Sequence, residues 1–440
     1  MLNKLKRAAL GAHTPHDKAT AASKPVPMPL PAQVRILMSQ HIGAPAKALV
    51  KKGDEVFVGT KIGEAGGFVS ANIHSSVSGT VAAVEPFRLS NGRMCDSVVI
   101  KTDGKQTVDP AVKAPEVTDK ASFLAAVREC GLVGLGGAGF PTHVKLTPKD
   151  EAAIDHVIVN GAECEPYLTS DYRVMLEQPE KVVGGLKVIL QLFDKAKGVI
   201  GIEENKPEAI RILSELVKDE PRIQVCTLKT KYPQGGERFL IYAVTGGREI
   251  NSTMLPADAG CIVDNIDTVV SIYNAVCETT PLIRRIITVT GDAIREPRNF
   301  EVRLGTNYQE LIEAAGGFKE EPEKVLSGGP MMGQALFSYD IPVMKTSSAL
   351  TCLTKDQVAA NAETACIRCG RCVDVCPGRV VPQMLMTAAE HHDLAAFEKL
   401  NGMECCECGS CTFICPAHRP LTQAFKEMRK AVMAERKKKA

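Results

Sequence analysis

The sequence lacks any apolar run long enough to cross a membrane, although 45% of its 440 residues are hydrophobic. Because a spanning helix needs roughly 18 or more consecutive apolar residues, we expect no integral membrane segment. The chain also lacks a strong charge of either sign, since 53 Lys and Arg against 51 Asp and Glu leave a net charge of +2. This balance does not favour bulk attraction to nucleic acid. The basic first residues include no apolar h-region and no cleavage site, so we expect no signal peptide.

A disulfide framework is also missing, despite the 16 cysteines of the chain. Half of the cysteines fall into two short runs near the C-terminus. The others are scattered, at Cys95, Cys130, Cys164, Cys226, Cys261, Cys277, Cys352 and Cys406. This distribution favours a reducing compartment and metal ligation over disulfide bonds.

The two cysteine runs have the same spacing. The first is Cys366-x2-Cys369-x2-Cys372-x3-Cys376 followed by Pro377, and the second is Cys405-x2-Cys408-x2-Cys411-x3-Cys415 followed by Pro416. Each is the bacterial ferredoxin pattern, in which the fourth cysteine binds the other cluster. We therefore predict two [4Fe–4S] clusters, the first held by Cys366, Cys369, Cys372 and Cys415, and the second by Cys405, Cys408, Cys411 and Cys376.

Structural zinc is the alternative interpretation of the CxxC pairs in these runs. A zinc site needs four ligands and has no use for the longer run with its terminal proline. Cys406 is an extra thiol inside the second run, and its spacing to Cys408 does not fit the ferredoxin motif.

The rest of the chain divides into segments with different residue patterns, and its length suggests about two to four domains. Short strands and turns predict a small all-β domain. Strands that alternate with helices predict a largely parallel sheet. In order, we expect an irregular arm at 1–32, the all-β domain at 33–110, an α/β domain at 115–280, a β-grasp-like unit at 283–335, a ferredoxin-like helical domain at 355–425 and a basic tail at 426–440. The predicted fold class is therefore a multidomain combination of α/β and α+β units.

A glycine-rich loop runs from Gly131 to Pro141 and contains a literal GxGxxG. A helix-like segment precedes it and a proline ends it, so it is not the standard dinucleotide fingerprint, which follows a strand and opens a helix. Its glycines would still let the backbone approach a phosphate or a flat ring closely. Lys145 is near enough in the sequence to add positive charge.

Three more polar clusters accompany this loop in the α/β segment. They are NGAECEP at 160–166, YPQGGE at 232–237 and DNIDT at 264–268. Polar groups at the carboxyl ends of strands lie where α/β sheets bind ligands. Four such clusters in one domain favour a bound cofactor over purely structural turns.

At these residues the chain resembles a known family. GLGGAGFPTHVKL is similar to the loop of the flavin-carrying, NADH-oxidising subunit of respiratory complex I. With the three other clusters and the two ferredoxin motifs in order, about residues 10–425 resemble the RnfC family. Its members belong to the Rnf complex, the membrane-bound ferredoxin:NAD⁺ oxidoreductase that pumps Na⁺ or H⁺. The resemblance implies a non-covalent FMN and an NAD(H) site.

The all-β segment resembles the barrel-sandwich fold of biotinyl and lipoyl carrier domains. Those carriers bear a modified lysine on a hairpin, and the equivalent position here falls near Phe68. We therefore expect a docking or scaffold domain and not a swinging-arm carrier.

The resemblance also implies a set of cofactor-binding residues. They are Gly134, Gly136, Gly137, Gly139, Phe140, Lys145, Asn160, Glu163, Glu165, Tyr232, Gly235, Gly236, Glu237, Asn265 and Thr268. Phe140 would stack near the nicotinamide or adenine. The chain departs from the complex I subunit at Ala162, Gly236 and Asp264, where that subunit has acidic, acidic and amide residues, so the hydrogen bonds to the flavin are expected to differ.

The implied function is that of a peripheral subunit on the cytoplasmic face of the cell membrane. It would exchange hydride with NAD(H) at FMN and pass single electrons through the two clusters, with no catalytic side chain in the hydride step. Its partners would be the ferredoxin-reactive iron–sulfur subunit and the membrane subunits of the complex, with ferredoxin acting indirectly. The basic tail is interpreted as a solvated end, and contact with phospholipid or a partner is the alternative.

Two other functions compete with this one. The cobalamin reductase of propanediol-utilisation compartments shares the loop and the cysteine runs, but we expect that family to begin with the glycine-rich loop. A relay or scaffold subunit with a vestigial nucleotide site is the second alternative. A flavin absorbance spectrum distinguishes the relay from the oxidoreductase.

The loop after Asn160 further predicts a preference for NADH over NADPH. Glu163, Glu165 and Asp171 could accept from a ribose 2′-OH and would repel a 2′-phosphate. The alternative is that Glu163 and Glu165 only bind flavin or cap a helix.

Overall fold

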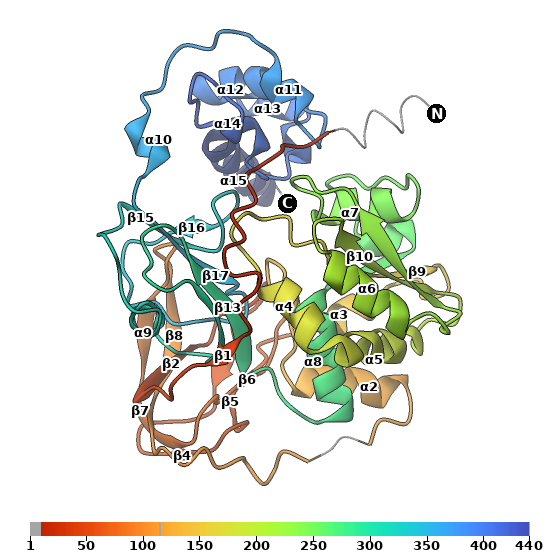
Figure 1. The fold of residues 1–440 in the computed structure, drawn as a ribbon, viewed down its shortest axis with the longest axis vertical. Coiled ribbons are helices and arrows are strands. Elements are labelled where there is room, and N and C mark those ends of the chain that lie inside the picture. Colours follow the sequence, from red (N-terminus) through yellow and green to blue (C-terminus); the bar gives the residue numbers. More distant parts are fainter. Residues whose placement is uncertain (1–9, 114–115, 440) are drawn as a thin grey trace.

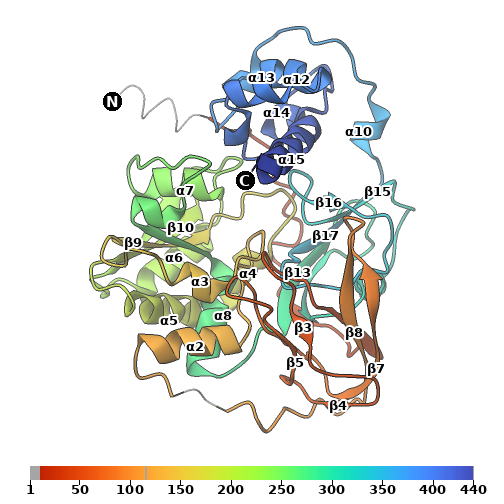
Figure 2. The same cartoon turned by 180° about the vertical axis from the view of Figure 1, so that it is seen from behind.

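The computed structural model of the protein describes residues 10–113 and 116–439. The start of the predicted arm, the first residue of the predicted α/β domain and the last residue of the predicted tail lie outside the described residues. Two β-rich units, an α/β unit and a helical unit pack together (Figure 1). The helical unit carries both cysteine runs at one end of the molecule, and strand β4 (Glu55–Val56) lies at the other end in both views (Figures 1 and 2).

The N-terminal β-rich unit has two small sheets around one core. One sheet has the order β2 (Gln33–Leu37), β8 (Met94–Thr102), β7 (Gly79–Arg88) and β4, and the other has the order β3 (Lys47–Ala48), β5 (Lys61–Glu64) and β6 (Ile73–His74). Alternate residues of β2, Val34 and Ile36, are buried in the same core as Ile62 and Ile73 of the second sheet. This arrangement agrees with the all-β pattern of the sequence.

The α/β unit contains a parallel sheet in the order β11 (Ile223–Leu228), β10 (Lys197–Glu203), β9 (His156–Gly161) and β12 (Cys261–Asn265). The helices of this unit are α2 (Lys120–Glu129), α3 (Thr142–Lys145), α4 (Ser170–Glu177), α5 (Pro179–Leu190), α6 (Pro207–Leu216), α7 (Glu237–Val244) and α8 (Ile266–Cys277), with a 3₁₀ turn, η1 (Pro256–Ala259). The chain builds outward from β9 on one side and then returns to add β12 on the other. The carboxyl ends of β9 and β12 therefore form a topological switch point, where such sheets bind ligands.

The apolar residues of β9 face both layers of helices. Val157 and Val159 belong to the core that includes α5 and α8, whereas Ile158 between them packs in a separate core with Leu240 and Ile241 of α7. Successive side chains of a strand point to opposite faces of the sheet. A continuous apolar run is therefore what a parallel strand covered on both sides requires.

The second β-rich unit is larger than the predicted segment 283–335. Its mixed sheet has the order β1 (Val26–Pro27), β14 (Arg298–Arg303), β13 (Arg284–Thr290), β17 (Ala349–Leu353), β15 (Lys324–Ser327) and β16 (Gln334–Ala335), with helix α9 (Tyr308–Ala314). β1 comes from the arm, whose sequence predicts an irregular segment, and it pairs in parallel with β14. β17 lies beyond the predicted boundary and pairs with both β13 and β15.

The helical unit holds both cysteine runs. Its helices are α10 (Gln357–Ala360), α11 (Arg371–Asp374), α12 (Pro382–Glu390), α13 (Leu394–Lys399), α14 (Ser410–Phe413) and α15 (Leu421–Lys439), with a 3₁₀ turn, η2 (Gly402–Glu404). The predicted basic tail is not a separate segment, because α15 begins before it and buries Phe425, Met428 and Val432 in the core of this unit. Among the described residues, no helix combines the length and the apolar character needed to cross a membrane.

Candidate functional site

The glycine-rich loop packs directly on the switch point. The backbone N–H of Leu135 donates to the Thr268 hydroxyl at 2.9 Å, so the loop rests on the first turn of α8. A Cβ atom at Gly136 would lie 2.8 Å from the Cβ of Asn265, closer than side chains pack, whereas a Cβ at Gly137 would meet nothing within 4 Å. The loop therefore touches the strand end through Gly136 and leaves open space beside its exposed neighbour Gly137.

Hydrogen bonds within the loop fix its ends. The Gly134 N–H donates to the Phe140 carbonyl at 2.8 Å, and the Gly139 carbonyl accepts from Ile42 of the N-terminal β-rich unit at 3.2 Å. Gly139 has a φ of +71° and a Cβ there would lie 2.8 Å from Thr346, so this position requires glycine. The Phe140 side chain is half-buried beside the loop.

Lys145 lies at the end of short helix α3 and reaches the carboxyl end of β12. Its Nζ donates to the Val263 carbonyl at 2.7 Å and lies 3.1 Å from Asp264 Oδ1. The Asp264 side chain is fully buried. Apart from this ion pair, its carboxylate has no hydrogen-bond partner in the described part of the chain. A buried carboxylate with spare acceptor capacity is a suitable partner for a donor group of a ligand.

The YPQGGE turn closes the site from the other side. Asn160 Nδ2, at the end of β9, donates to the Gly235 carbonyl at 2.8 Å, and a Cβ at Gly235 would lie 3.3 Å from the Ala162 Cβ. Gly236 precedes α7, and Glu237 is the exposed first residue of that helix. Tyr232 is fully buried, and burial near Glu165 and Cys164 raises its pKa. The structure thus brings all four predicted polar clusters to one edge of the sheet.

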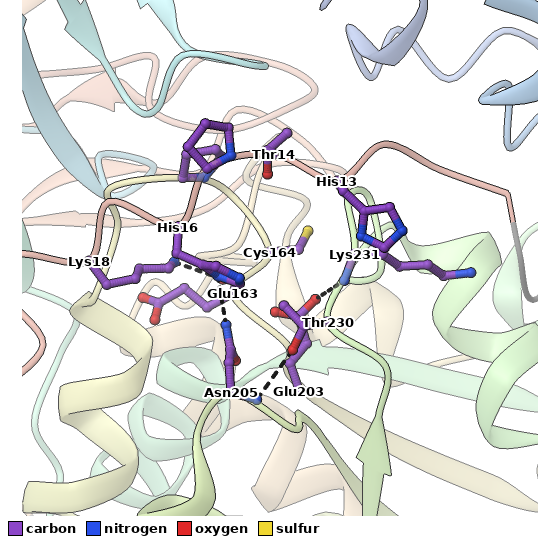
Figure 3. Close-up of a pocket in the computed structure, with 12 residues that line it drawn as sticks. His13, Thr14, His16, Lys18, Glu163, Cys164, Glu203, Asn205, Thr230 and Lys231 are labelled. Atoms are coloured by element: carbon purple, nitrogen blue, oxygen red, sulfur yellow. Dashed lines mark hydrogen bonds between the residues drawn. The ribbon is translucent and has the colours of Figure 1, made fainter. Parts of the chain in front are cut away.

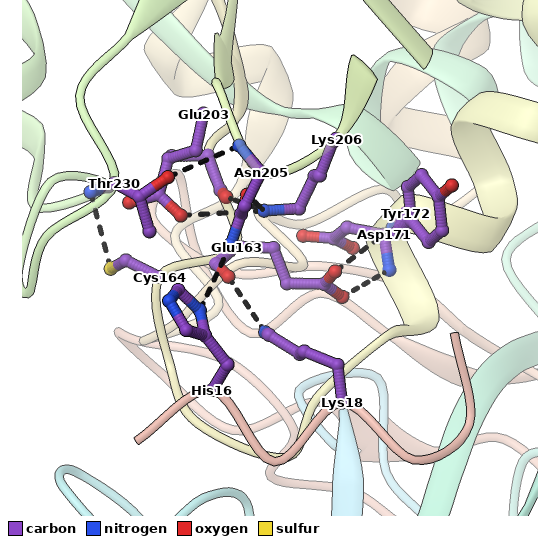
Figure 4. Close-up of polar contacts among 12 residues, drawn as sticks. His16, Lys18, Glu163, Cys164, Asp171, Tyr172, Glu203, Asn205, Lys206 and Thr230 are labelled. Carbon is purple, nitrogen blue, oxygen red and sulfur yellow. Dashed lines mark hydrogen bonds and ion pairs between the residues drawn. The ribbon is translucent and has the colours of Figure 1, made fainter. Parts of the chain in front are cut away.

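Glu163 has the helix-capping role that the sequence left open as an alternative. Its carboxylate accepts from the backbone N–H groups of Asp171 at 2.7 Å and Tyr172 at 3.2 Å, and so caps helix α4, whose Thr169 N-cap gives no side-chain hydrogen bond (Figure 4). Burial raises the pKa of Glu163, and the charges of Lys18 and Lys206 oppose that rise. Glu163 therefore fixes the loop after β9 to helix α4 and acts as a structural support of the site.

Lys18 of the N-terminal arm fixes the same loop. Its Nζ donates to the carbonyls of Glu163 at 3.0 Å, Glu165 at 2.8 Å and Leu168 at 2.6 Å. Lys206 donates to the Ala162 carbonyl at 2.5 Å. The sequence of the arm contains no binding motif. Its contact with a loop about 150 positions away therefore could not be predicted from local sequence.

Glu165 is also occupied by protein groups. Its Oε1 accepts from the backbone N–H of Met331 at 2.7 Å and Met332 at 3.1 Å. Together with the cap by Glu163, this corrects the prediction that these two carboxylates are available to accept from a dinucleotide ribose 2′-OH. Glu163 is the helix cap of the alternative interpretation, and Lys18 and Lys206 bring positive charge beside it.

A small polar cavity of about 70 Å³ lies between the arm and the carboxyl ends of β9, β10 and β11 (Figure 3). His13, His16 and Lys18 form its arm side, and Glu203 and Thr230 are among the residues opposite. It lies beside the switch point, and no sequence pattern indicated it.

The first three motif cysteines of the second run line a separate cavity together with one cysteine of the first run. Its lining includes Cys376, Cys405, Cys408 and Cys411, and the extra thiol Cys406. For the other predicted set, Cys372 lies close enough to Cys366 and Cys415 for their charges to influence its pKa, which burial raises. Within the described residues, no three His, Cys, Asp or Glu side chains converge on a point suited to one metal ion.

The second cysteine loop also borders the cofactor edge. A Cβ at Gly409 would lie 2.8 Å from the Met331 carbonyl, in the turn that donates to Glu165. Glu404 accepts from Arg238 of α7 at 3.0 Å and from the Ser252 N–H at 2.9 Å. The helical unit is therefore fastened to the α/β unit next to the YPQGGE turn.

Comparison with known proteins relates the two β-rich units and the α/β unit to described domains. Residues 6–105 match the family described as "RnfC Barrel sandwich hybrid domain", residues 127–274 match "Nuo51 FMN-binding domain", and residues 286–335 match "SLBB domain".

Relatives with similar sequences span nearly the whole chain. The RnfC-type member of the Na⁺-translocating ferredoxin:NAD⁺ oxidoreductase complex of Acetobacterium woodii is 45% identical over 432 residues, which are 97% of each chain. The proton-translocating counterpart of Clostridium ljungdahlii is 46% identical over 379 residues, which are 85% of this chain and 82% of the relative.

Among solved structures, the NAD⁺-reducing [NiFe]-hydrogenase in the H₂-reduced state has a similar fold. The TM-score is 0.50 at 17% identity, and the match covers 74% of this chain and 62% of the hydrogenase chain, less than two thirds of its length. At this identity the likeness concerns the fold alone.

Proposed function

The chain belongs to the RnfC family of the ion-translocating ferredoxin:NAD⁺ oxidoreductase complexes, and from this premise we propose that it binds FMN at the β9–β12 switch point and exchanges electrons with NAD(H) there. It is an electron-transfer subunit that works with the other subunits of such a complex. Two [4Fe–4S] clusters in the helical unit connect the flavin site to those partners.

The observation that carries the proposal is the contact of Gly136 with Asn265 beside the open space at Gly137. The loop is held down on the strand end at one glycine, and the next glycine leaves room for a flat group or a phosphate to approach the backbone. The buried Asp264 carboxylate provides acceptor capacity at the same place. These features fit a bound flavin nucleotide.

The proposed pocket is formed by residues that meet at this edge. They are Gly134, Gly136, Gly137, Gly139, Phe140, Lys145, Asn160, Tyr232, Gly235, Gly236, Glu237, Asn265 and Thr268, with Glu163 and Glu165 shaping the loop from behind. When bound, FMN accepts a hydride and releases electrons singly, which neither nicotinamide nor an iron–sulfur cluster does alone. The protein residues position the ring, and Lys145 offsets negative charge.

The cysteine cavity supports the proposed cluster assignment. A cubane binds each thiolate to a different iron, so four sulfur atoms must surround a space and need not converge on one point. Cys376 lines that space together with Cys405, Cys408 and Cys411. We assign the second cluster to these four residues and the first to Cys366, Cys369, Cys372 and Cys415.

We further propose that the subunit is peripheral and sits on the cytoplasmic face of the membrane. No described helix is suited to crossing a bilayer, so attachment would depend on partner subunits. Release from membranes by a mild chaotrope without detergent is expected, and extraction by detergent alone would contradict this attachment.

The deciding experiment is a spectrum of the purified full-length chain after anaerobic iron–sulfur reconstitution with FMN. We expect flavin absorbance that survives gel filtration, is bleached by NADH and is restored by ferricyanide. We expect NADPH to bleach the flavin more slowly than NADH, as the predicted preference for NADH requires. Full iron content without retained flavin or NADH bleaching would indicate a relay subunit instead.

A further inference from the structure

The two cysteine loops have equal spacing but opposite surroundings. Cys366 and Cys369 of the first loop are exposed to solvent, whereas Cys408 and Cys411 of the second loop are buried. The second loop faces inward, because Gly409 approaches the Met331 carbonyl of the neighbouring β-rich unit. Among the described residues, the first loop therefore exposes its proposed cluster ligands to another molecule more fully than the second loop does.

Equivalent positions of the two loops carry different residues. Where the second loop has Ser410, which is fully buried, the first has the exposed Arg371. Where the second has Glu407, paired with Arg429, the first has Arg368.

The same contrast holds for the residue after the first cysteine of each run. Cys406 lines the inner cavity of the second loop, and its counterpart in the first loop is Ile367, which is 67% exposed. An apolar side chain at this exposure gains nothing from the fold of the isolated chain.

The charge of the two loops differs in the same direction. The run 366–376 holds Arg368, Arg371 and a single acid, Asp374, while the run 405–415 holds one glutamate and no cation. Within the described residues, neither Arg368 nor Arg371 has an ion pair or hydrogen bond through its guanidinium group. Both guanidinium groups are thus available to carboxylates of a partner.

We propose that Ile367, Arg368 and Arg371, here called the first-cluster rim, form the docking surface for an acidic iron–sulfur electron carrier. The inference rests on the proposed cluster assignment and adds which cluster meets the partner. One electron leaves the cluster of one protein and enters that of the other, so one centre is oxidised as the other is reduced, and no bond forms or breaks. The exposed isoleucine supplies apolar contact and the arginines supply attraction and orientation.

The test uses the reconstituted full-length protein and an acidic two-[4Fe–4S] ferredoxin as the probe. Affinity is measured by calorimetry at low and at physiological ionic strength for the parent and for Arg368→Glu/Arg371→Glu. We expect affinity at low salt to fall by about tenfold or more, with a weaker dependence on salt. Iron content and NADH bleaching of the flavin are recorded for each protein, so loss of the proposed flavin function is seen separately.

The matched control is Lys51→Glu/Lys52→Glu, which makes the same change in net charge. These exposed lysines lie just before β4, at the opposite end of the molecule (Figure 2). Equal loss in both variants, or no loss in either, would overturn the proposal. A second variant, Arg368→Gln/Arg371→Gln, should give an intermediate loss of ferredoxin affinity. It replaces the charge-reversal variant in the test if that variant has a lowered iron content.

Two further probes test whether the first-cluster rim binds a different kind of partner. A basic c-type cytochrome should bind the Arg368→Glu/Arg371→Glu variant better than the parent, as reversed charge complementarity requires. Vesicles of phosphatidylglycerol test a membrane surface. If the arginines govern vesicle binding and leave ferredoxin binding unchanged, the rim is a lipid contact and the proposal fails.

Discussion

The Lys18 side chain holds the backbone of Glu163 in place across 145 positions of sequence, with its Nζ 3.0 Å from the Glu163 carbonyl. Two more carbonyls of the same loop accept from this amino group. The N-terminal arm is therefore part of the support of the cofactor edge.

Replacing Lys18 with methionine should destabilise the protein and loosen the loop. Three carbonyls lose a charged donor and Glu163 loses a neighbouring positive charge, which together should cost about 2 kcal/mol of the free energy of unfolding. Thermal melting and FMN retention report both effects. Lys24→Met is the control, because Lys24 is 77% exposed and its ion pair with Glu177 is a surface contact. Equal melting temperatures for the two variants would contradict the role of Lys18.

Gly136→Ala should weaken FMN binding because it displaces the loop. Gly137→Ala should cause no such displacement, because its methyl group meets no protein atom. The new methyl group at Gly136 would collide with Asn265 at 2.8 Å, whereas at Gly137 it enters open space. We expect about a tenfold or greater rise in the FMN dissociation constant for Gly136→Ala, since a displaced loop loses at least one contact worth about 1.4 kcal/mol. Fluorescence titration of the apo-protein measures both variants. If only Gly137→Ala weakened binding, the loop would have to present its other side to the ligand.

Lys345 predicts a specific pH dependence of stability. It is fully buried at the junction of three units, where its Nζ donates to the carbonyls of Asn72 and Gly131, each at 2.7 Å. Burial lowers the pKa of Lys345 from 10.5 to about 7. Because the folded pKa lies below the unfolded one, stability from this group is full above pH 10.5 and is lost as the pH falls through about 7.

Lys345→Met should flatten this part of the pH profile. The parent should gain stability relative to the variant as the pH rises from about 7 towards 10.5, which denaturant unfolding at several pH values measures. Lys149→Met, at an exposed position, is the control and should keep the parent profile. Parallel curves for the parent and Lys345→Met would show that the ammonium group is not titrating on folding.

Cys376→Ala should damage the cluster of the second cysteine run and spare the first. Cys376 lines the cavity of Cys405, Cys408 and Cys411, although it belongs to the first run. Electron paramagnetic resonance of the reduced protein, with iron analysis, should show the loss of one cluster. Cys406→Ala is the control from the same cavity and should keep both signals. Selective loss of the other cluster would reverse the assignment.

Much of the architecture follows from local patterns. The continuous apolar run of β9 and its polar end at Asn160 are properties of adjacent residues, and they indicate a buried parallel strand with a ligand edge. The spacing of the cysteine runs is also local, so the grouping of Cys376 with the second run could be predicted from the motif alone. These signals act over one strand or one loop.

The order of the units, the glycine-rich loop and the cysteine motifs could be read from the amino-acid sequence, because periodicity and ligand spacing are set by neighbouring residues. The bounds of the second β-rich unit could not, because β17 joins its sheet from beyond the predicted segment. Three other features depend on the folded chain: Glu163 caps α4, Lys18 holds its loop, and β1 of the arm joins a distant sheet. The side chains of glutamate and lysine can hydrogen-bond to backbone groups in many parts of a protein, so their residue type alone does not identify the partner. Which bond they form depends on the groups that folding brings within about 3.2 Å, because a hydrogen bond weakens at longer distances.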